Sequence, residues 1–294
     1  MKRREFITQT AYGLGAAWLG SKAAFPAGLP GRISATDTVT LGKTGIRTSR
    51  LAMGTGTVGT GHHSHQTALG IQGLSDLLWH GYDQGLRFFD LADSYGSHPH
   101  AAEALKHVPR DKVAIMTKSW ARDAAGMRAD IDRFRKELNT DYIDVFMMHC
   151  LTEDGWTQKY AGAMDALSEA KQKGIIRAHG CSCHSIGALR DATHSPWVEV
   201  HLVRVNPIGS HMDAVREGAP AEPQTVLSLM HEMRAAGKGI IGMKILGQGD
   251  MRDRVDEALK YALSLGLLDA FTIGAESRNE QDDLVQRIGS VGTA

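Results

Sequence analysis

Short apolar runs alternate with stretches of helical spacing along most of this chain. An apolar run of this length, bounded by turn residues, predicts a buried strand. The eight predicted strands are Leu51–Gly54, Arg87–Asp90, Val113–Thr117, Tyr142–Met148, Ala178–Ser182, Leu202–Val205, Ile240–Ile245 and Phe271–Ile273. Upstream of them, Thr38–Leu41 and Ile46–Ser49 flank a Gly-Lys-Thr-Gly turn and predict a β-hairpin.

The segments between these strands repeat apolar residues at intervals of three and four, as amphipathic helices do. The predicted helices are Gln66–Gln84, Met127–Leu138, Tyr160–Lys173, Pro223–Ala236, Arg254–Leu265 and Gln281–Ile288. Strands that alternate with helices predict right-handed crossovers and a parallel sheet. Eight such units predict closure, so the expected fold is α/β, a (βα)8 TIM barrel with an N-terminal β-hairpin.

An open, doubly wound sheet is the alternative architecture. It would normally carry a G-x-G-x-x-G phosphate-binding turn between an early strand and a helix. The segment Gly54–Gly59 is a near match, one residue short in its spacing. It runs into the histidine-rich segment His62–His65 instead of an amphipathic helix, and this context favours the barrel.

The first 30 residues differ in composition from the rest of the chain. Met1–Ile7 is basic and contains paired arginines, and the stretch Ala11–Gly20 is small and apolar. This is the pattern of an export signal, and the apolar stretch is too short to span about 30 Å of hydrocarbon. The paired arginines before Glu-Phe-Ile resemble a twin-arginine signal. We therefore expect residues 1–30 to address the twin-arginine export machinery and residues 36–294 to form the barrel. The mature chain would be periplasmic or otherwise exported, folded before translocation, with no stable membrane insertion.

Composition removes several other functions from consideration. The chain has 294 residues, a formal net charge of zero and no basic tract beyond its N-terminus, so nucleic-acid binding has little support. Three cysteines are too few for a disulfide scaffold, although a bridge from Cys150 to Cys181 or Cys183 stays open. The histidines of His62–His65 do not define a tetrahedral metal site without further ligands, and no metal is predicted.

Ionisable side chains follow three of the predicted strands. Asp90 and Tyr95 lie in RFFDLADSYG, Lys118 in AIMTKSW and His149 in YIDVFMMHC. Barrels collect their chemistry at the carboxyl ends of the strands, so these four groups should converge. Tyr95 would donate a proton to a carbonyl oxygen, Lys118 would lower the pKa of that phenol, Asp90 would hold Lys118, and His149 would bind the same oxygen. Taken singly, each residue also has a structural interpretation; their shared placement favours function.

The strings FFDLADSYG, MTKSW, FMMHC and RAHGCS, in this order, resemble the aldo-keto reductases from about Thr38 to about Asp283. The resemblance implies hydride transfer from NAD(P)H to an aldehyde or ketone, or the reverse oxidation of an alcohol. It implies catalytic roles for the same four residues. Two alternatives stay open: a redox-sensing regulatory or binding subunit on a reductase barrel, and a sugar oxidoreductase or epimerase with tightly bound nicotinamide.

Cofactor contacts are also expected, most of them from this resemblance. The candidates are Gly54, Thr55, Ser182, Cys183, Arg204, Met243, Leu246, Gly247, Gln248, Gly274, Ser277, Arg278 and Asp283. Cys183 stands where the family has an asparagine, Arg204 where a glutamine is usual, and Met243 where an aromatic ring stacks on the nicotinamide. Ser277 and Arg278 could take a 2′-phosphate, which favours NADP(H) over NAD(H). The substrate would be a small carbonyl compound or a sugar.

Overall fold

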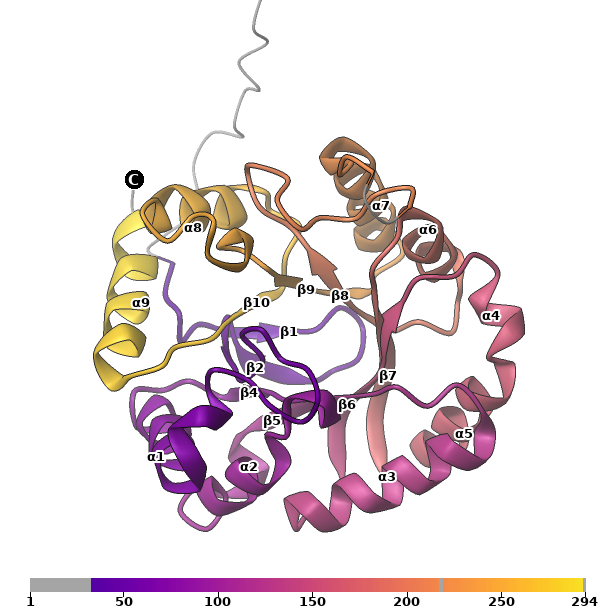
Figure 1. The fold of residues 1–294 in the computed structure, drawn as a ribbon, viewed down its shortest axis with the longest axis horizontal. Coiled ribbons are helices and arrows are strands. Elements are labelled where there is room, and N and C mark those ends of the chain that lie inside the picture. The colour runs from indigo at the N-terminus through magenta and orange to yellow at the C-terminus, as the bar shows by residue number, and fades with distance from the viewer. Residues whose placement is uncertain (1–32, 217–218, 293–294) are drawn as a thin grey trace, which may run out of the picture.

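Eight parallel strands close into a barrel with helices around it in the computed structural model, which describes residues 33–216 and 219–292 (Figure 1). The strands are β3 (Leu51–Gly54), β4 (Phe88–Asp90), β5 (Ala114–Ser119), β6 (Ile143–Leu151), β7 (Ile176–Cys183), β8 (Val200–Arg204), β9 (Gly239–Met243) and β10 (Ala270–Ile273). They neighbour one another in chain order, and β10 pairs with β3 to close the ring. The predicted fold class is confirmed, while the predicted export signal lies outside the described residues.

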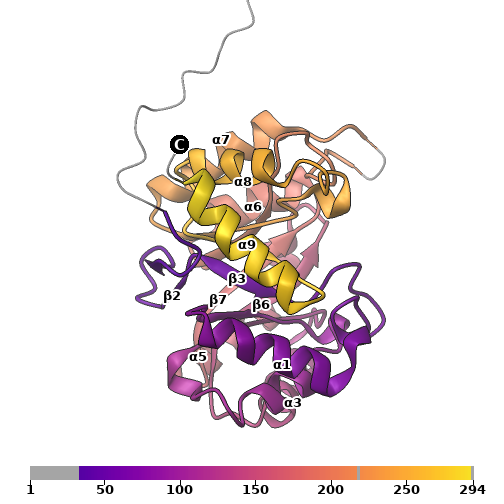
Figure 2. The same ribbon diagram turned by 90° about the vertical axis from the view of Figure 1, so that its left-hand side faces the viewer.

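The predicted hairpin consists of β1 (Thr38–Thr40) and β2 (Arg47–Ser49), paired antiparallel. Leu41 and Ile46, between the two strands, are buried and pack with the side chains that fill the barrel interior. Gly42 has a φ of +49°, and a Cβ there would lie 2.3 Å from the backbone nitrogen of Gly239. The hairpin therefore closes one end of the barrel, and the long connecting loops lie at the other end (Figure 2).

Nine α-helices are described, with several 3-10 turns between them. The helices are α1 (Gly70–Asp83), α2 (His98–Ala104), α3 (Ala124–Leu138), α4 (Trp156–Lys159), α5 (Ala161–Gln172), α6 (Ile186–His194), α7 (Pro223–Ala235), α8 (Val255–Ser264) and α9 (Arg278–Val291). Helices α2, α4 and α6 were not predicted from the sequence, because they are too short to show a clear period. None of the helices in the described residues is long and apolar enough to cross a membrane.

Alternation along the strands divides the core into two parts. Inward residues such as Phe88 on β4, Met116 on β5 and Met147 on β6 fill the barrel, and outward residues pack against the helices. The next inward positions are Asp90, Lys118 and His149, because side chains two apart on a strand share a face. Strands β5 and β6 run past their predicted ends, to Ser119 and Leu151, so the polar residues form the top layer of the barrel interior.

Candidate active site

A buried ion pair forms the base of the polar layer. Lys118 is 0% exposed, and its Nζ donates to Asp90 Oδ1 at 2.5 Å and to the Leu91 carbonyl oxygen at 2.7 Å. The second carboxylate oxygen of Asp90 accepts a hydrogen bond from Thr272 Oγ1 at 2.7 Å. Each charge thus has its partner and further hydrogen bonds, which a buried pair needs to offset its desolvation. The expected pairing of Asp90 with Lys118 is present.

Tyr95 lies above this pair, on the 3-10 turn Asp93–Tyr95 that follows β4. Its ring is packed against the loop after β3: a Cβ on Gly56 or on Gly59 would lie 2.3 Å from a ring carbon. Lys118 Nζ lies 4.7 Å from the centroid of the same ring. A side chain at either loop position would therefore clash with the Tyr95 ring, so both positions require glycine. That role was not predicted, although the repeated glycines of GTGTVG are a sequence signal for a close approach of the backbone.

The pKa of the Tyr95 hydroxyl is shifted opposite to the expected direction. Burial, followed by the negative charge of Asp90, raises this pKa well above its usual value. The ammonium of Lys118 lies over the ring and is committed to Asp90 and to the Leu91 carbonyl, so it does not offset these effects. The expectation that Lys118 lowers the pKa in this structure is wrong. The phenol is held in its protonated form, which is the form that donates a proton.

His149 is the second polar group that faces the phenol. Its ring lies edge-on to the Tyr95 ring at 5.7 Å between centroids, and its Nδ1 is 3.5 Å from Ser94 Oγ. Burial, with the nearby charge of Lys118, lowers the pKa of His149 well below 6.5. The imidazole is therefore neutral near pH 7, with one ring nitrogen as donor and the other as acceptor.

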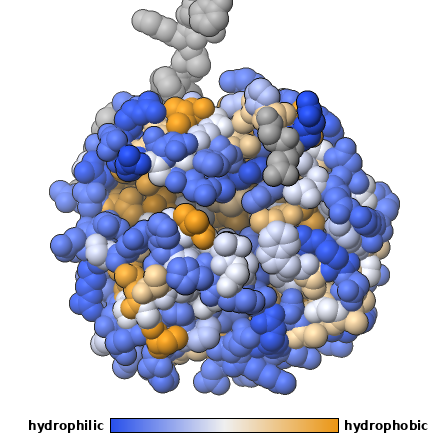
Figure 3. Space-filling model, in the orientation of Figure 1, coloured by the Kyte–Doolittle hydropathy of each residue, from blue (hydrophilic) through white to orange (hydrophobic). Residues whose placement is uncertain are grey.

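Apolar side chains border the mouth above this group. Trp120, 51% exposed, lies with its ring centroid 5.3 Å from that of His149. Val58 and Ile208, in the loops after β3 and β8, are exposed as well. The mouth face is hollowed near its centre, with apolar side chains among polar ones (Figure 3). Trp120 was not among the residues predicted from the sequence, and its ring forms part of the apolar border beside His149.

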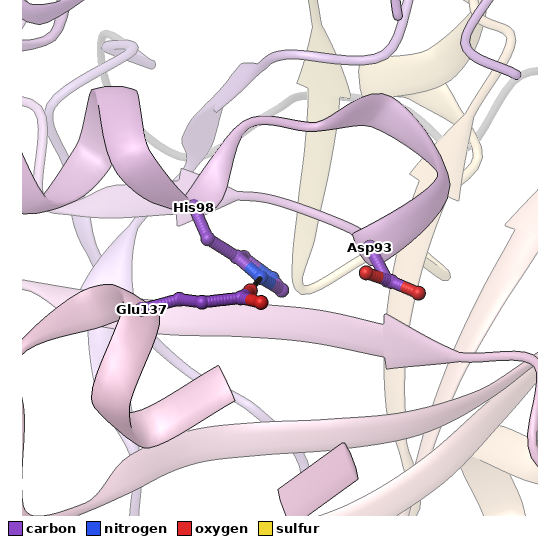
Figure 4. A group of neighbouring side chains, drawn as sticks. All are labelled: Asp93, His98 and Glu137. Atoms are coloured by element: carbon purple, nitrogen blue, oxygen red, sulfur yellow. Dashed lines mark hydrogen bonds and ion pairs between the residues drawn. The ribbon is translucent and has the colours of Figure 1, made fainter. Parts of the chain in front are cut away.

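An ion-pair network anchors the turn that carries Tyr95. Asp93, His98 and Glu137 place their ligand-type atoms within 4.8 Å of one another, the kind of grouping that can hold a metal (Figure 4). Arg133, however, donates to Asp93 at 2.8 Å and to Glu137 at 2.9 Å. Both ring nitrogens of His98 are engaged, with Glu137 and with Thr117, at 2.7 Å each. The guanidinium supplies the positive charge, and the trio fixes the loop after β4 to α3.

The cysteine and serine candidates on β7 fall on opposite faces of the strand. Ser182 points to the barrel interior side, and its Oγ accepts a hydrogen bond from the Cys150 backbone nitrogen at 2.9 Å. Cys183 packs in the layer between sheet and helices, with its Sγ 3.9 Å from that of Cys181. The Cys183 thiol is thus buried between sheet and helices, away from the barrel interior, while its contact with a nicotinamide stays a prediction.

Cys150 departs from the alternation expected after His149. Its φ is +52°, and the pairing of β6 with β7 shifts register there. The Sγ atom lies 3.4 Å from His184 Nε2, and burial raises the thiol pKa to about 11. Regular alternation would put the side chains of His149 and Cys150 on opposite faces of β6, but the left-handed conformation at Cys150 interrupts that alternation. All three cysteines carry free thiols in the structure.

Two further candidates lie at the ends of β8 and β9. Arg204 is paired in register with Met243, and its Nη2 donates to Asp213 Oδ1 at 2.5 Å. Asp213 comes from the loop after β8 and is fully buried. Met243 packs against the barrel interior and is partly exposed, as a side chain that covers a ring face would be. Sequence reasoning had no signal for the partnership of Arg204 with Asp213.

The loop after β9 and the start of α9 hold the remaining cofactor candidates. Gly247 and Gln248 have positive φ values of 55° and 57° in a tight turn that begins after Leu246. Ser277 caps α9, its Oγ accepting from the Glu280 nitrogen at 3.2 Å. Arg278, the first residue of α9, makes no ion pair among the described residues.

Four candidates are engaged within the protein. Thr55 donates through Oγ1 to the Asp90 carbonyl oxygen at 2.8 Å and is fully buried. A Cβ on Gly54 would lie 2.9 Å from the Gly274 nitrogen, so these two glycines allow β3 and β10 to approach. Asp283 accepts from Arg287 Nε at 2.6 Å. The side chains of Thr55 and Asp283 are thus already satisfied without a ligand.

Comparison with known proteins shows which family this chain resembles. The sequence model described as "Aldo/keto reductase family" matches residues 50–265. The NADH-specific methylglyoxal reductase of Escherichia coli (strain K12) is 27% identical over 167 residues, 49% of this chain and 51% of that protein. Methylglyoxal reductase DkgA of Escherichia coli O157:H7 is 27% identical over 198 residues, 63% of this chain and 68% of the relative. The chain thus spans about half to two thirds of these relatives.

Solved structures share the fold over most of their length. A putative aldo-keto reductase from Pseudomonas aeruginosa superposes with a TM-score of 0.72 at 21% identity, covering 88% of this chain and 97% of the other. The Bombyx mori aldo-keto reductase AKR2E4, in complex with NADP, gives a TM-score of 0.62 at 14% identity, covering 89% and 93%.

Proposed function

The chain belongs to the aldo/keto reductase family, and on that premise we propose that it reduces an aldehyde or ketone with NAD(P)H, or oxidises the corresponding alcohol. One observation carries the proposal. Tyr95 and His149 face each other at 5.7 Å between ring centroids, directly above the buried pair of Asp90 and Lys118. A protonated phenol and a neutral imidazole that share one small space can bind and protonate a single carbonyl oxygen.

The residues divide the work of proton transfer. Bound NAD(P)H supplies a hydride to the carbonyl carbon. Tyr95 Oη donates its proton as negative charge grows on the oxygen, and its raised pKa keeps the phenol protonated until then. His149, neutral at pH 7, donates a ring N–H to the same oxygen. Lys118, paired with Asp90, forms the buried base on which the phenol ring rests, with its Nζ 4.7 Å from the ring centroid.

The chain has groups that fit a nicotinamide dinucleotide. Met243 offers an apolar surface inside the mouth. Arg278 stands at the start of a fourteen-residue helix without an ion-pair partner among the described residues, which suits a 2′-phosphate. The relatives do not decide between the two cofactors, because one is NADH-specific and another was solved in complex with NADP. We propose NADP(H) over NAD(H) on the position of Arg278 alone.

Turnover by a tyrosine variant tests this function. NADPH consumption is followed by absorbance with methylglyoxal and a panel of aldehydes, ketones and sugars. Tyr95→Phe should lower kcat about 100-fold to 10,000-fold, the range for loss of a general acid, while NADPH affinity is kept. Tyr142→Phe, at the opposite end of the barrel before β6, is the matched control and should keep full activity. Full turnover by Tyr95→Phe would refute the mechanism.

We also propose that the protein is exported through the twin-arginine route. The support is the basic Met1–Ile7 segment with Arg3 and Arg4 before Glu-Phe-Ile. Fractionation of cells that express the full chain provides the test. The double variant Arg3→Lys/Arg4→Lys should accumulate unprocessed in the cytoplasm, whereas Lys2→Arg should be exported like the unmodified chain. Equal export of all three would exclude the route.

A further inference from the structure

Arg204 is a buried cation that uses little of its hydrogen-bonding capacity. It is 9% exposed, and a guanidinium carries five N–H donors. In the described structure it donates only through Nη2, to Asp213, and its Nε is buried without a partner. Asp213 is 0% exposed and has one unpartnered carboxylate oxygen as well. Unpaired donors away from water are costly, so such a group calls for an acceptor that the chain does not provide.

Lys244 places a second cation beside Arg204. It follows Met243, the residue that pairs with Arg204 between β8 and β9. Its Nζ donates to Gln248 Oε1 at 2.7 Å and has no carboxylate within ion-pair distance in the described residues. Burial and the charge of Arg204 lower the pKa of Lys244. The two cations thus have one carboxylate near them, Asp213, and it is bonded to Arg204 and not to Lys244.

The backbone holds Lys244 in place. Its φ is +56°, a left-handed conformation that costs free energy for a side chain other than glycine. Asn206 fixes it there: Asn206 Nδ2 donates to the carbonyl oxygens of Lys244, at 3.2 Å, and Ser210, at 2.7 Å. The nitrogen of Gly247 donates to the Lys244 carbonyl oxygen at 2.8 Å. These hydrogen bonds hold the backbone of Lys244 in one conformation.

Neighbouring groups do not neutralise this charge. His184 and Cys150 lie next to the two cations and to each other, at 3.4 Å from Nε2 to Sγ. Burial, together with the charges of Arg204 and Lys244, lowers the pKa of His184 to about 3. Burial raises the pKa of Cys150 to about 11, so both are neutral near pH 7. A net positive charge remains at this side of the barrel mouth.

We propose that Arg204, held by Asp213, and Lys244 form an anion-binding site inside the barrel mouth, which takes a phosphate or carboxylate group. A guanidinium fork matches the oxygens of either anion, and an ammonium beside it adds a point charge. The anion belongs either to the cofactor, as its pyrophosphate, or to the substrate, as a carboxylate or phosphate on the carbonyl compound. This inference rests on the proposed function only for the identity of that source.

A thermal-shift titration of the full chain tests anion binding without catalysis. Inorganic pyrophosphate, and separately phosphate, is added to the unmodified protein, to Lys244→Gln and to the double variant Arg204→Gln/Asp213→Asn. The double variant removes both charges of the buried pair, so that no isolated carboxylate is left to unfold the protein. Lys260→Gln, an exposed lysine on α8, is the matched control. Pyrophosphate should raise the Tm of the unmodified chain and the control by the same amount, and have little effect on the other two.

Two further measurements identify the source of the anion. The first is the Kd for NADPH from fluorescence titration. The second is kcat/KM for 4-carboxybenzaldehyde against that for its neutral isostere 4-formylbenzamide. Loss of a charge-assisted contact should weaken one of these by about 10-fold to 100-fold in Lys244→Gln. A change in the Kd assigns the anion to the cofactor, and a selective loss for the carboxylate aldehyde assigns it to the substrate.

The outcomes separate this proposal from the proposed function. If 4-formylbenzamide and the other carbonyls are not reduced at all, the reductase assignment fails, while the thermal shifts still decide whether anions bind. The anion site does not exist if two results are found together. Pyrophosphate and phosphate would shift the Tm of all four proteins equally, or of none. Lys244→Gln would change both the Kd for NADPH and the ratio of kcat/KM for the two aldehydes by less than about twofold.

Discussion

His201 is a buried imidazole whose loss should change how stability depends on pH. It lies on β8 between Val200 and Leu202, which both point into the barrel, so its own side chain faces the helices. It is 1% exposed, and neither ring nitrogen has a hydrogen-bond partner in the described structure. Burial, and then the charge of Lys238, lowers its pKa to about 3. The native state thus keeps this ring neutral throughout the physiological range.

The sign and size of the effect follow from proton linkage. An unfolded histidine titrates near 6.5, so below that pH the unfolded chain binds a proton that the native chain refuses until about pH 3. Stability is therefore full above pH 6.5 and is lost as pH falls toward 3. The loss from this group is about 1.4 kcal/mol at pH 5.5 and about 2.7 kcal/mol at pH 4.5, and the first value hardly depends on how low the native pKa is.

Urea unfolding at pH 7.5 and pH 5.5 measures this term. The free energy of unfolding of the unmodified chain should fall between the two pH values by about 1.4 kcal/mol more than that of His201→Leu. His63→Leu, which removes an exposed imidazole from the loop after β3, is the control and should retain the pH dependence of the unmodified chain. The reasoning fails if His201→Leu loses as much free energy between the two pH values as the unmodified chain.

Three further substitutions test the site. Asp90→Asn leaves Lys118 as a buried cation without a carboxylate and should destabilise the fold by about 3–5 kcal/mol in urea unfolding; a change below about 1 kcal/mol would contradict the role of the pair. Gly56→Ala would drive a methyl group into the ring of Tyr95, and kcat/KM should fall about 100-fold with NADPH affinity kept. Unaltered kinetics would show that the loop yields instead. Ser277→Ala removes the cap of α9 and should cost about 1 kcal/mol in thermal unfolding; an unchanged Tm would mean that the cap is replaced.

Local patterns in the sequence were sufficient to predict the barrel and the convergence of Asp90, Tyr95, Lys118 and His149. Strand alternation places Asp90, Lys118 and His149 two positions after inward apolar residues, which is a local property of each strand. The predicted ends of β5 and β6 were too short, because polar residues at the barrel top look like loop residues in a sequence. Helices α2 and α6 escaped prediction because seven and nine residues give too few turns for a period.

Contacts between distant segments could not be read in the same way. Three features depend on how loops meet above the barrel. They are the ion pair of Arg204 with Asp213, the close packing of Gly56 on the Tyr95 ring, and the left-handed conformation of Cys150. Loop conformations carry no periodic signal, and the side chains involved are also common at surfaces. The packing of Cys183 between sheet and helices likewise depends on the neighbouring elements.

The order of apolar and polar residues alone determined that this chain forms a closed parallel barrel with a phenol, an ammonium, a carboxylate and an imidazole at one end. Those features follow from the number of strand–helix units and from the position of each polar residue at or just after the end of a strand. The tertiary structure decided the charge states: burial keeps Tyr95 protonated and His149 neutral, and it leaves Arg204 and Lys244 with one carboxylate between them. A pKa depends on the solvent that is excluded and on the charges that are near, and both are set only when distant segments pack together.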